Sequence, residues 1–207
     1  MSILDKLVAA VTPPESDEAR REAREKARSA ARDGDWLDTI LQHHEMIESA
    51  FAEVRASTDA AARNAAHRRL ALLLTGHSIA EEAVIYPALA RADEKGHSTK
   101  AYTEQAAAKA QLGLLGNLAP MSQEYLDKLE HIRGAVLHHV YEEEGEWFLD
   151  LCQRLDASEQ RLLGERYREE FERYMGDDAP EAQGRQAQPR FAPGSKLGLG
   201  GDATTPG

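Results

Sequence analysis

The residues of this chain whose types and spacing could do chemistry form a motif that occurs twice. One copy begins at His77 and the other at His139. In each copy the histidine is followed, after three residues, by two glutamates, and then by an aromatic residue and a leucine. On a helix, a histidine and a glutamate four residues apart project from one face. Two such pairs that face each other in a helical bundle make a metal site.

A third histidine, His44, lies in the middle of the apolar stripe of a helix predicted over residues 36–57. The apolar residues within about 60° of His44 on that helix are Leu37, Ile40, Leu41, Ile47 and Phe51. Three histidines and two glutamates on core-facing surfaces need a common explanation, because a buried carboxylate without a partner is costly. A metal ion that takes imidazole nitrogen and carboxylate oxygen together supplies one. Mutual salt bridges among these side chains are the alternative.

The elements that must position these residues are all helical. Apolar periodicity predicts four helices, with a last helix after them, over residues 36–57, 60–92, 98–118, 122–154 and 157–175. The connections among the first four are short, which favours antiparallel neighbours. We therefore expect an all-α, up-down-up-down four-helix bundle with extra N-terminal and C-terminal helices. Pro87 lies inside the second helix and predicts a kink near residues 83–87.

Composition divides the chain into three parts. Residues 1–34 are predicted to form an N-terminal helical arm, 35–176 the bundle with its C-terminal helix, and 177–207 a flexible tail rich in Gly, Pro, Ala and Gln. The arm has little apolar surface between residues 17 and 32, so we expect a solvated helix there, with a dimer contact as the weaker alternative. His67 and His131 are expected to face solvent.

The charge and the single cysteine exclude several classes of function. The net charge is −11 and the pI about 5.2, which disfavours a nucleic-acid partner. One cysteine allows neither a disulfide framework nor a cysteine-based zinc site. The longest apolar run, residues 70–75, is too short to span a membrane, and no signal peptide is evident. We expect a cytoplasmic protein that binds neither nucleic acid nor membrane, and the sequence leaves its oligomeric state open.

The order of these motifs resembles the hemerythrin-like (HHE cation-binding) domain family over about residues 35–153. The most specific part is the first motif, in which Tyr86 and Pro87 follow the glutamates. The resemblance implies a four-helix bundle around a non-haem di-iron centre, two Fe2+/Fe3+ ions with an oxo or hydroxo bridge, although manganese would accept the same donors. The ligands that the resemblance implies are His44, His77, Glu81, His139 and Glu143, with the two carboxylates bridging the metals.

The sequence departs from the family pattern in the third predicted helix. Gln105 stands where the family usually has a histidine, about as far before His139 as His44 stands before His77. An amide oxygen is a weak ligand, and Glu104 and Glu48 are further candidates. We therefore expect one iron to have fewer imidazoles and a more open coordination position. That favours peroxide or oxygen chemistry, or iron sequestration, over reversible oxygen carriage.

Three hypotheses for function follow. The first is a binding protein that handles O2, NO or iron at the di-iron centre, and the second is an enzyme that disproportionates peroxide or reduces another small oxidant. The third is a structural bundle without metal. In all but the last, the partner is a small diatomic or peroxide ligand, and residues 106–108, all alanine, favour a cavity beside the metal. His138 with Glu142 is an alternative ligand pair, but it lies on a polar face.

Overall fold

The structure is a computed structural model that describes residues 15–92 and 95–176. Within these ranges every regular element is helical and no strand is present. The all-α prediction is therefore confirmed for the described part. The predictions of a flexible tail over residues 177–207 and of helical turns before Pro13 lie outside the described residues.

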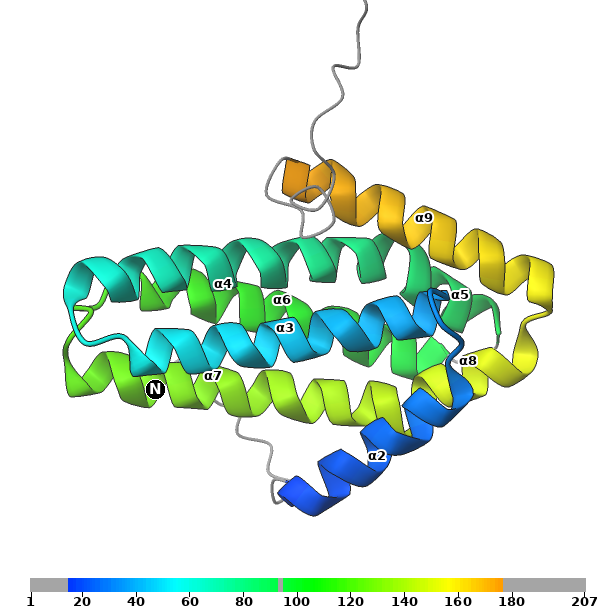
Figure 1. The fold of residues 1–207 in the computed structure, drawn as a ribbon, viewed down its shortest axis with the longest axis horizontal. Helices are drawn as coiled ribbons and strands as arrows, with labels where there is room; N and C mark the ends of the chain where they lie inside the picture. The colour runs from blue at the N-terminus through cyan, green and yellow to red at the C-terminus, as the bar shows by residue number, and fades with distance from the viewer. Residues whose placement is uncertain (1–14, 93–94, 177–207) are drawn as a thin grey trace, which may run out of the picture. The chain divides into compact units, whose positions relative to one another are not determined.

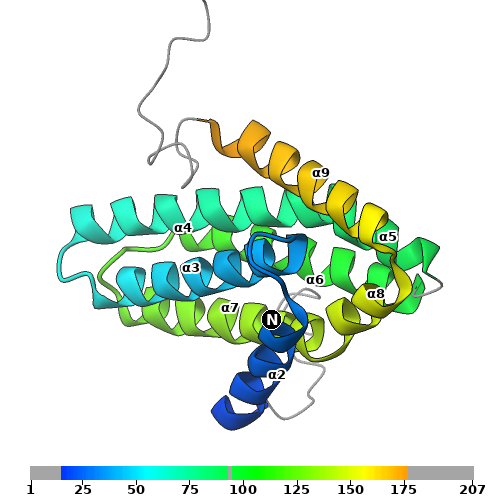
Figure 2. The same ribbon diagram turned by 45° about the vertical axis from the view of Figure 1, so that its right-hand side comes forward.

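Four long helices lie side by side around the core, as Figures 1 and 2 show. They are α3 (Trp36–Ala56), α4 (Ala60–Ala80), α6 (Lys95–Leu115) and α7 (Gln123–Glu142). Helix α3 packs on α4 and α7, and α6 packs on the same two helices. Asp35, Asp59 and Ser122 begin three of these helices, because each side chain accepts a hydrogen bond from a backbone N–H of the first turn.

The apolar stripe predicted for α3 is buried in full. Its members, Leu37, Ile40, Leu41, Ile47 and Phe51, are at most 2% exposed, and His44 among them is 0% exposed. Burying one such side chain stabilises the fold by about 1.5–3 kcal/mol. The hydrophobic face that holds α3 in the bundle is therefore also the face that carries His44 into the core.

The second and fourth predicted helices are each interrupted by a π-helical turn. The first, η1 (Glu81–Ile85), leads into α5 (Tyr86–Arg91), and the second, η2 (Glu143–Trp147), leads into α8 (Phe148–Arg154). The interruption before Pro87 was predicted as a kink, whereas the one in the fourth helix has no proline and was not predicted. Both turns begin at the first glutamate of the motif. Single π-turns inside α-helices are frequent at functional sites.

Two further helices, α2 (Asp17–Ala30) and α9 (Ala157–Met175), lie outside the four-helix core (Figure 2). The prediction of a solvated helix over residues 17–32 is wrong, because Ala23 and Ala27 of α2 are 4% and 0% exposed against the bundle. Alanine contributes little to an apolar count, yet it lets two helices approach closely. Helix α9 packs on α3 and α4, and Gly76 lets it do so: a Cβ there would lie 2.9 Å from the sulfur of Met175.

Two histidines outside the motifs differ in their environment. His131 is exposed, as predicted. The prediction for His67 is wrong: it is 9% exposed, and its Nε2 lies 3.2 Å from the carbonyl oxygen of Leu112 on α6. The polar face of α4 is covered there by α6, which local periodicity does not reveal. Across the described ranges, no helix has both the length and the apolar character that crossing a membrane requires.

Candidate metal centre

The two motifs and His44 meet at one point in the core. Nε2 of His77 lies 3.1 Å from Oε2 of Glu81, and Nε2 of His139 lies 3.2 Å from Oε1 of Glu143. His44 lies between the two pairs, with its Nε2 3.4 Å from Oε2 of Glu143 and 3.9 Å from Oε1 of Glu81. Both glutamates are 0% exposed. The structure therefore brings the five predicted ligand residues together.

All three histidines turn Nε2 inward because another group holds Nδ1. Nδ1 of His44 lies 2.8 Å from Glu144, and Nδ1 of His139 lies 2.9 Å from Glu104. Nδ1 of His77 lies 3.0 Å from the hydroxyl of Tyr167, on α9. An outer hydrogen bond of this kind is the usual companion of a metal-ligating histidine, because it fixes the tautomer and the ring orientation.

Several buried polar atoms at this point have no hydrogen-bond partner within the described part of the chain. They are Nε2 of His44, Oε1 of Glu81, Oε2 of Glu143 and Oε1 of Gln105. A buried polar group without a partner is costly, and the ion-pair contacts of His44 with the two glutamates, at 3.4 and 3.9 Å, do not have hydrogen-bond geometry. A metal ion satisfies a nitrogen and two carboxylate oxygens at once.

The donor atoms form two overlapping groups, each of which could hold a metal ion. Two sets of three residues place one donor atom each within 4.8 Å of one another. The first set is His44, His77 and Glu81, and the second is Glu81, His139 and Glu143. Glu81 belongs to both sets. The donor chemistry and the unpartnered atoms fit a cation centre.

The two pairs differ in electrostatics. Burial and the charge of Glu143 raise the pKa of Glu81 to about 8, and burial with the charge of His44 lowers the pKa of His77 well below its ordinary value. Burial alone would lower the pKa of His139, but the carboxylates of Glu143 and Glu104 raise it well above its ordinary value. His139 and His44 in turn lower the pKa of Glu143, against the effect of burial.

The hydroxyl of Tyr86 lies inside the centre, among the side chains of the two motifs. Its oxygen is 3.0 Å from Oε1 of Glu143, 3.0 Å from Nε2 of His139 and 3.2 Å from Oε2 of Glu81. Burial and the two carboxylates raise the pKa of Tyr86 well above its ordinary value. Tyr86 directly follows the π-turn η1 and begins α5.

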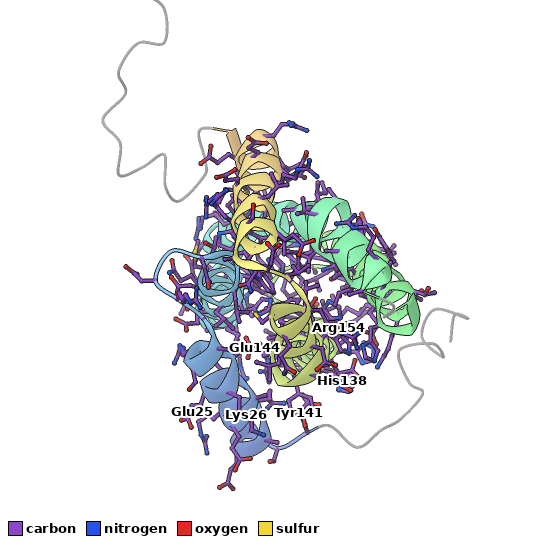
Figure 3. The ribbon with its side chains drawn as sticks, turned by 90° about the vertical axis from the view of Figure 1, so that its right-hand side faces the viewer. Glu25, Lys26, His138, Tyr141, Glu144 and Arg154 are labelled. Carbon is purple, nitrogen blue, oxygen red and sulfur yellow. The ribbon has the colours of Figure 1, made fainter. Side chains whose placement is uncertain are left out.

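Glu144 and Arg24 also belong to the site, and sequence reasoning missed both. Nε and Nη2 of Arg24 donate to the Glu144 carboxylate at 2.9–3.0 Å, and the same carboxylate contacts Nδ1 of His44. Figure 3, which looks along the bundle, labels Glu144 between α2 and α8. The available signal was the second glutamate of the motif, whose counterpart Glu82 instead pairs with Lys109 at a half-exposed position.

The less certain ligand candidates make other contacts. Glu48 pairs with Arg24 at 2.6 Å, and its side chain is 38% exposed. Glu104 holds Nδ1 of His139, and Nε2 of Gln105 donates to Oε2 of Glu81 at 2.5 Å. Their roles as ligands stay predictions, and of the three only Glu104 and Gln105 contact a predicted ligand residue.

The alternative pair on α7 lies away from the centre. Nδ1 of His138 contacts Glu15 at 2.8 Å, and its Nε2 is 3.8 Å from Glu142. His138, Glu142 and Glu104 form a third group whose donor atoms lie close together, but all three residues are only half-buried. Charged groups surround this cluster, including Lys100, which pairs with Glu142.

A helical bundle whose core gathers three histidines and two carboxylates defines the class of cation-binding helical proteins. The pattern of one such family, the hemerythrin HHE cation-binding domain, matches residues 36–151. The match covers more than half of the chain, so the chain belongs to this family, as the sequence predicted.

The chain is also similar to a protein of Nostoc sp. (strain PCC 7120) that is described as a DNA nickase. The two are 28% identical over 122 residues, which are 59% of this chain and 35% of that protein. The match therefore spans about a third of the length of the relative. No solved structure matches the chain.

Proposed function

We propose that this chain holds two iron ions between its two motifs and handles a small ligand there, O2, NO or peroxide. The observation that supports it best is the set of inward-facing donor atoms without partners, backed by histidines whose other nitrogen is already held. His44, His77 and Glu81 would hold one ion, and His139 and Glu143 the other, with the carboxylates between them. Bound there, iron supplies Lewis acidity and one-electron redox chemistry. Manganese would accept the same donors.

The proposal includes the finer arrangement of the fold. In an up-down-up-down order, α3 with α4 and α6 with α7 form two equivalent hairpins, each of which contributes one motif to the centre. We also propose a cytoplasmic location, in keeping with the acidic charge and the single cysteine.

A second candidate is an enzyme that disproportionates peroxide, so that two H2O2 give two H2O and one O2. It is favoured by Gln105, which stands in the place of a histidine and leaves the second motif with fewer nitrogen donors. A role on DNA, which the name of the Nostoc relative would suggest, is not favoured, because a net charge of −11 opposes binding to phosphate.

Metal loading tests the proposed function. The purified chain is loaded with Fe2+ without oxygen, its iron is counted, and its visible spectrum is recorded before and after O2, NO or H2O2 is added. We expect two irons per chain and a spectral change with at least one ligand. A colourless chain that takes up no iron, and is no more stable with it, would instead support a structural bundle without metal.

A further inference from the structure

A small cavity opens beside the centre, between α4, α6 and α7. Its volume is about 20 Å³, and its lining includes His77, His139 and Gln105. Ala108 and Ala135 form part of the wall, and their small side chains leave this space open. A cavity of this size holds about one water-sized molecule. A ligand of two heavy atoms would therefore fill the cavity with one atom and place the other atom toward the candidate metal centre.

Gln105 lines this cavity, and one of its polar atoms has no hydrogen-bond partner in the described residues. The side chain is 4% exposed, and its Nε2 donates to Oε2 of Glu81 at 2.5 Å. A metal-ligating carboxylate only accepts hydrogen bonds, so the nitrogen of the amide must face Glu81 and the oxygen must face elsewhere. That oxygen, Oε1, is buried and has no partner in the described residues. It is a hydrogen-bond acceptor without a donor among the described residues.

We propose that the ligand of this cavity carries an O–H group, as hydrogen peroxide does, and that Oε1 of Gln105 accepts its hydrogen bond. This inference rests on the proposed function and selects among its ligands. O2 and NO carry no hydrogen, so either one would leave the buried acceptor unsatisfied. A site built to hydrogen-bond a ligand hydroxyl discriminates strongly against an analogue without one. Water satisfies the same acceptor until peroxide replaces it.

The chain contains a matched control for Gln105. Gln111 lies on the same helix, is also 4% exposed, and also has a buried Oε1 without a partner in the described residues. It does not line the cavity. Replacing either glutamine with methionine removes a buried amide from α6 at a similar side-chain volume, but only the change at position 105 removes an acceptor from the cavity.

The experiment compares four iron-loaded proteins: the unchanged chain, Gln105→Met, Ala108→Val and Gln111→Met. For each, iron per chain is counted, the concentration of H2O2 that gives half of the maximal spectral change is measured, and the affinity of the reduced protein for NO is titrated. We expect Gln105→Met to raise the half-maximal H2O2 concentration about tenfold, the effect of one lost hydrogen bond. This variant also loses the Nε2 donor to Glu81, so each protein is loaded with iron to full occupancy before its ligands are titrated. Its NO affinity should then stay within about threefold, because the lost acceptor bond is absent with NO. Gln111→Met should change none of the three.

Ala108→Val keeps the amide but fills the cavity, so it should weaken both ligands. If Gln105→Met does not fold, unchanged ligand responses in Ala108→Val would still overturn the proposal. Gln105→Met overturns it as well if its response to H2O2 is unchanged, or if iron and both ligands are lost together, since Gln105 would then act on the metal. An unchanged chain that binds no iron would instead contradict the proposed function itself.

Discussion

The two halves of the centre share a motif but differ in what surrounds it. In both, a π-turn begins at the ligand glutamate, Glu81 or Glu143, and the histidine one turn earlier points Nε2 inward. Behind His77 stands the neutral hydroxyl of Tyr167, whereas behind His139 stands the carboxylate of Glu104. The outer partners therefore differ by one negative charge.

The two halves also have opposite electrostatics, which come mainly from burial and from the charges of His44, Glu143 and His139. In the first half the pKa of the histidine is lowered and the pKa of the glutamate is raised, which favours a neutral pair in the metal-free protein. In the second half both shifts are reversed, which favours an ion pair. A carboxylate behind an imidazole makes it a more basic ligand. The repeated motif thus lies in two unequal environments.

The largest expected effect comes from removing a ligand of the second half. His139→Ala should lose most of its bound metal, because it removes a nitrogen donor and leaves Glu143 buried without its partner. His138→Ala, one residue earlier on α7, should keep its metal, since His138 contacts Glu15 instead. Metal per chain after dialysis measures both. The reverse result would mean that the wrong face of α7 has been assigned to the centre.

The next largest effect should come from α2. Arg24→Ala leaves Glu144, whose side chain is 2% exposed, without its cation, and so loosens the support of His44. We expect metal affinity to fall about 10–100-fold, measured by competition with a chelator. Arg28→Ala is the control. Arg28 lies on the same helix but at the surface, where it pairs with Glu45 of α3, and the two side chains are 54% and 45% exposed. It should change stability by less than about 1 kcal/mol and leave metal affinity alone. Equal losses of metal affinity in the two variants would mean that the Arg24–Glu144 contact does not support metal binding.

The difference between the outer partners can be tested directly. Glu104→Gln keeps a hydrogen-bond acceptor on His139 but removes the charge, and should lower metal affinity about tenfold. Tyr167→Phe removes the neutral hydroxyl that contacts His77 and His43, and should lower affinity about threefold. If the tyrosine variant were the weaker metal binder of the two, the charge behind His139 would not be the feature that distinguishes the halves.

The smallest effect expected is a change in pH dependence. Burial and the charge of His44 lower the pKa of His43 to about 3, and its Nδ1 lies 2.8 Å from the hydroxyl of Tyr167. The unfolded chain takes up this proton near pH 6.5, the folded chain only near pH 3. Between these values the unfolded state binds more protons, so the free energy of unfolding of the metal-free protein falls as the pH falls. His43→Gln should make that slope shallower by up to one proton, as denaturant titrations at several pH values would show. Parallel slopes would mean that His43 titrates alike in both states.

The sequence predicts the parts of this protein that depend on local pattern. The apolar stripe around His44 and the two motifs specify helices and their inward faces, so the all-helical class and the burial of the five predicted ligand residues follow from periodicity. The interruption near Pro87 was predicted because proline removes a backbone donor. The π-turn η2 has no proline, and nothing in its sequence indicates a wider turn.

The parts that could not be predicted depend on packing between distant segments. Arg24 reaches Glu144 across 120 positions of sequence, and Tyr167 reaches His77 across 90. Each contact requires an outer helix to sit against the bundle, and short side chains such as Ala27 and Gly76 carry that packing with little hydrophobic signal. The predicted ligand residues can therefore be identified from the sequence. The outer partners that differ between the two halves can be identified only from the fold.

The central claim is that two metal ions lie between these unequal halves. X-ray absorption at the iron edge, on protein loaded with Fe2+ and then oxidised in air, tests it most directly. The account predicts two irons per chain, ligands of nitrogen and oxygen only, and a metal–metal distance of about 3.5 Å. A single iron per chain without metal–metal scattering, or no bound iron, would contradict it.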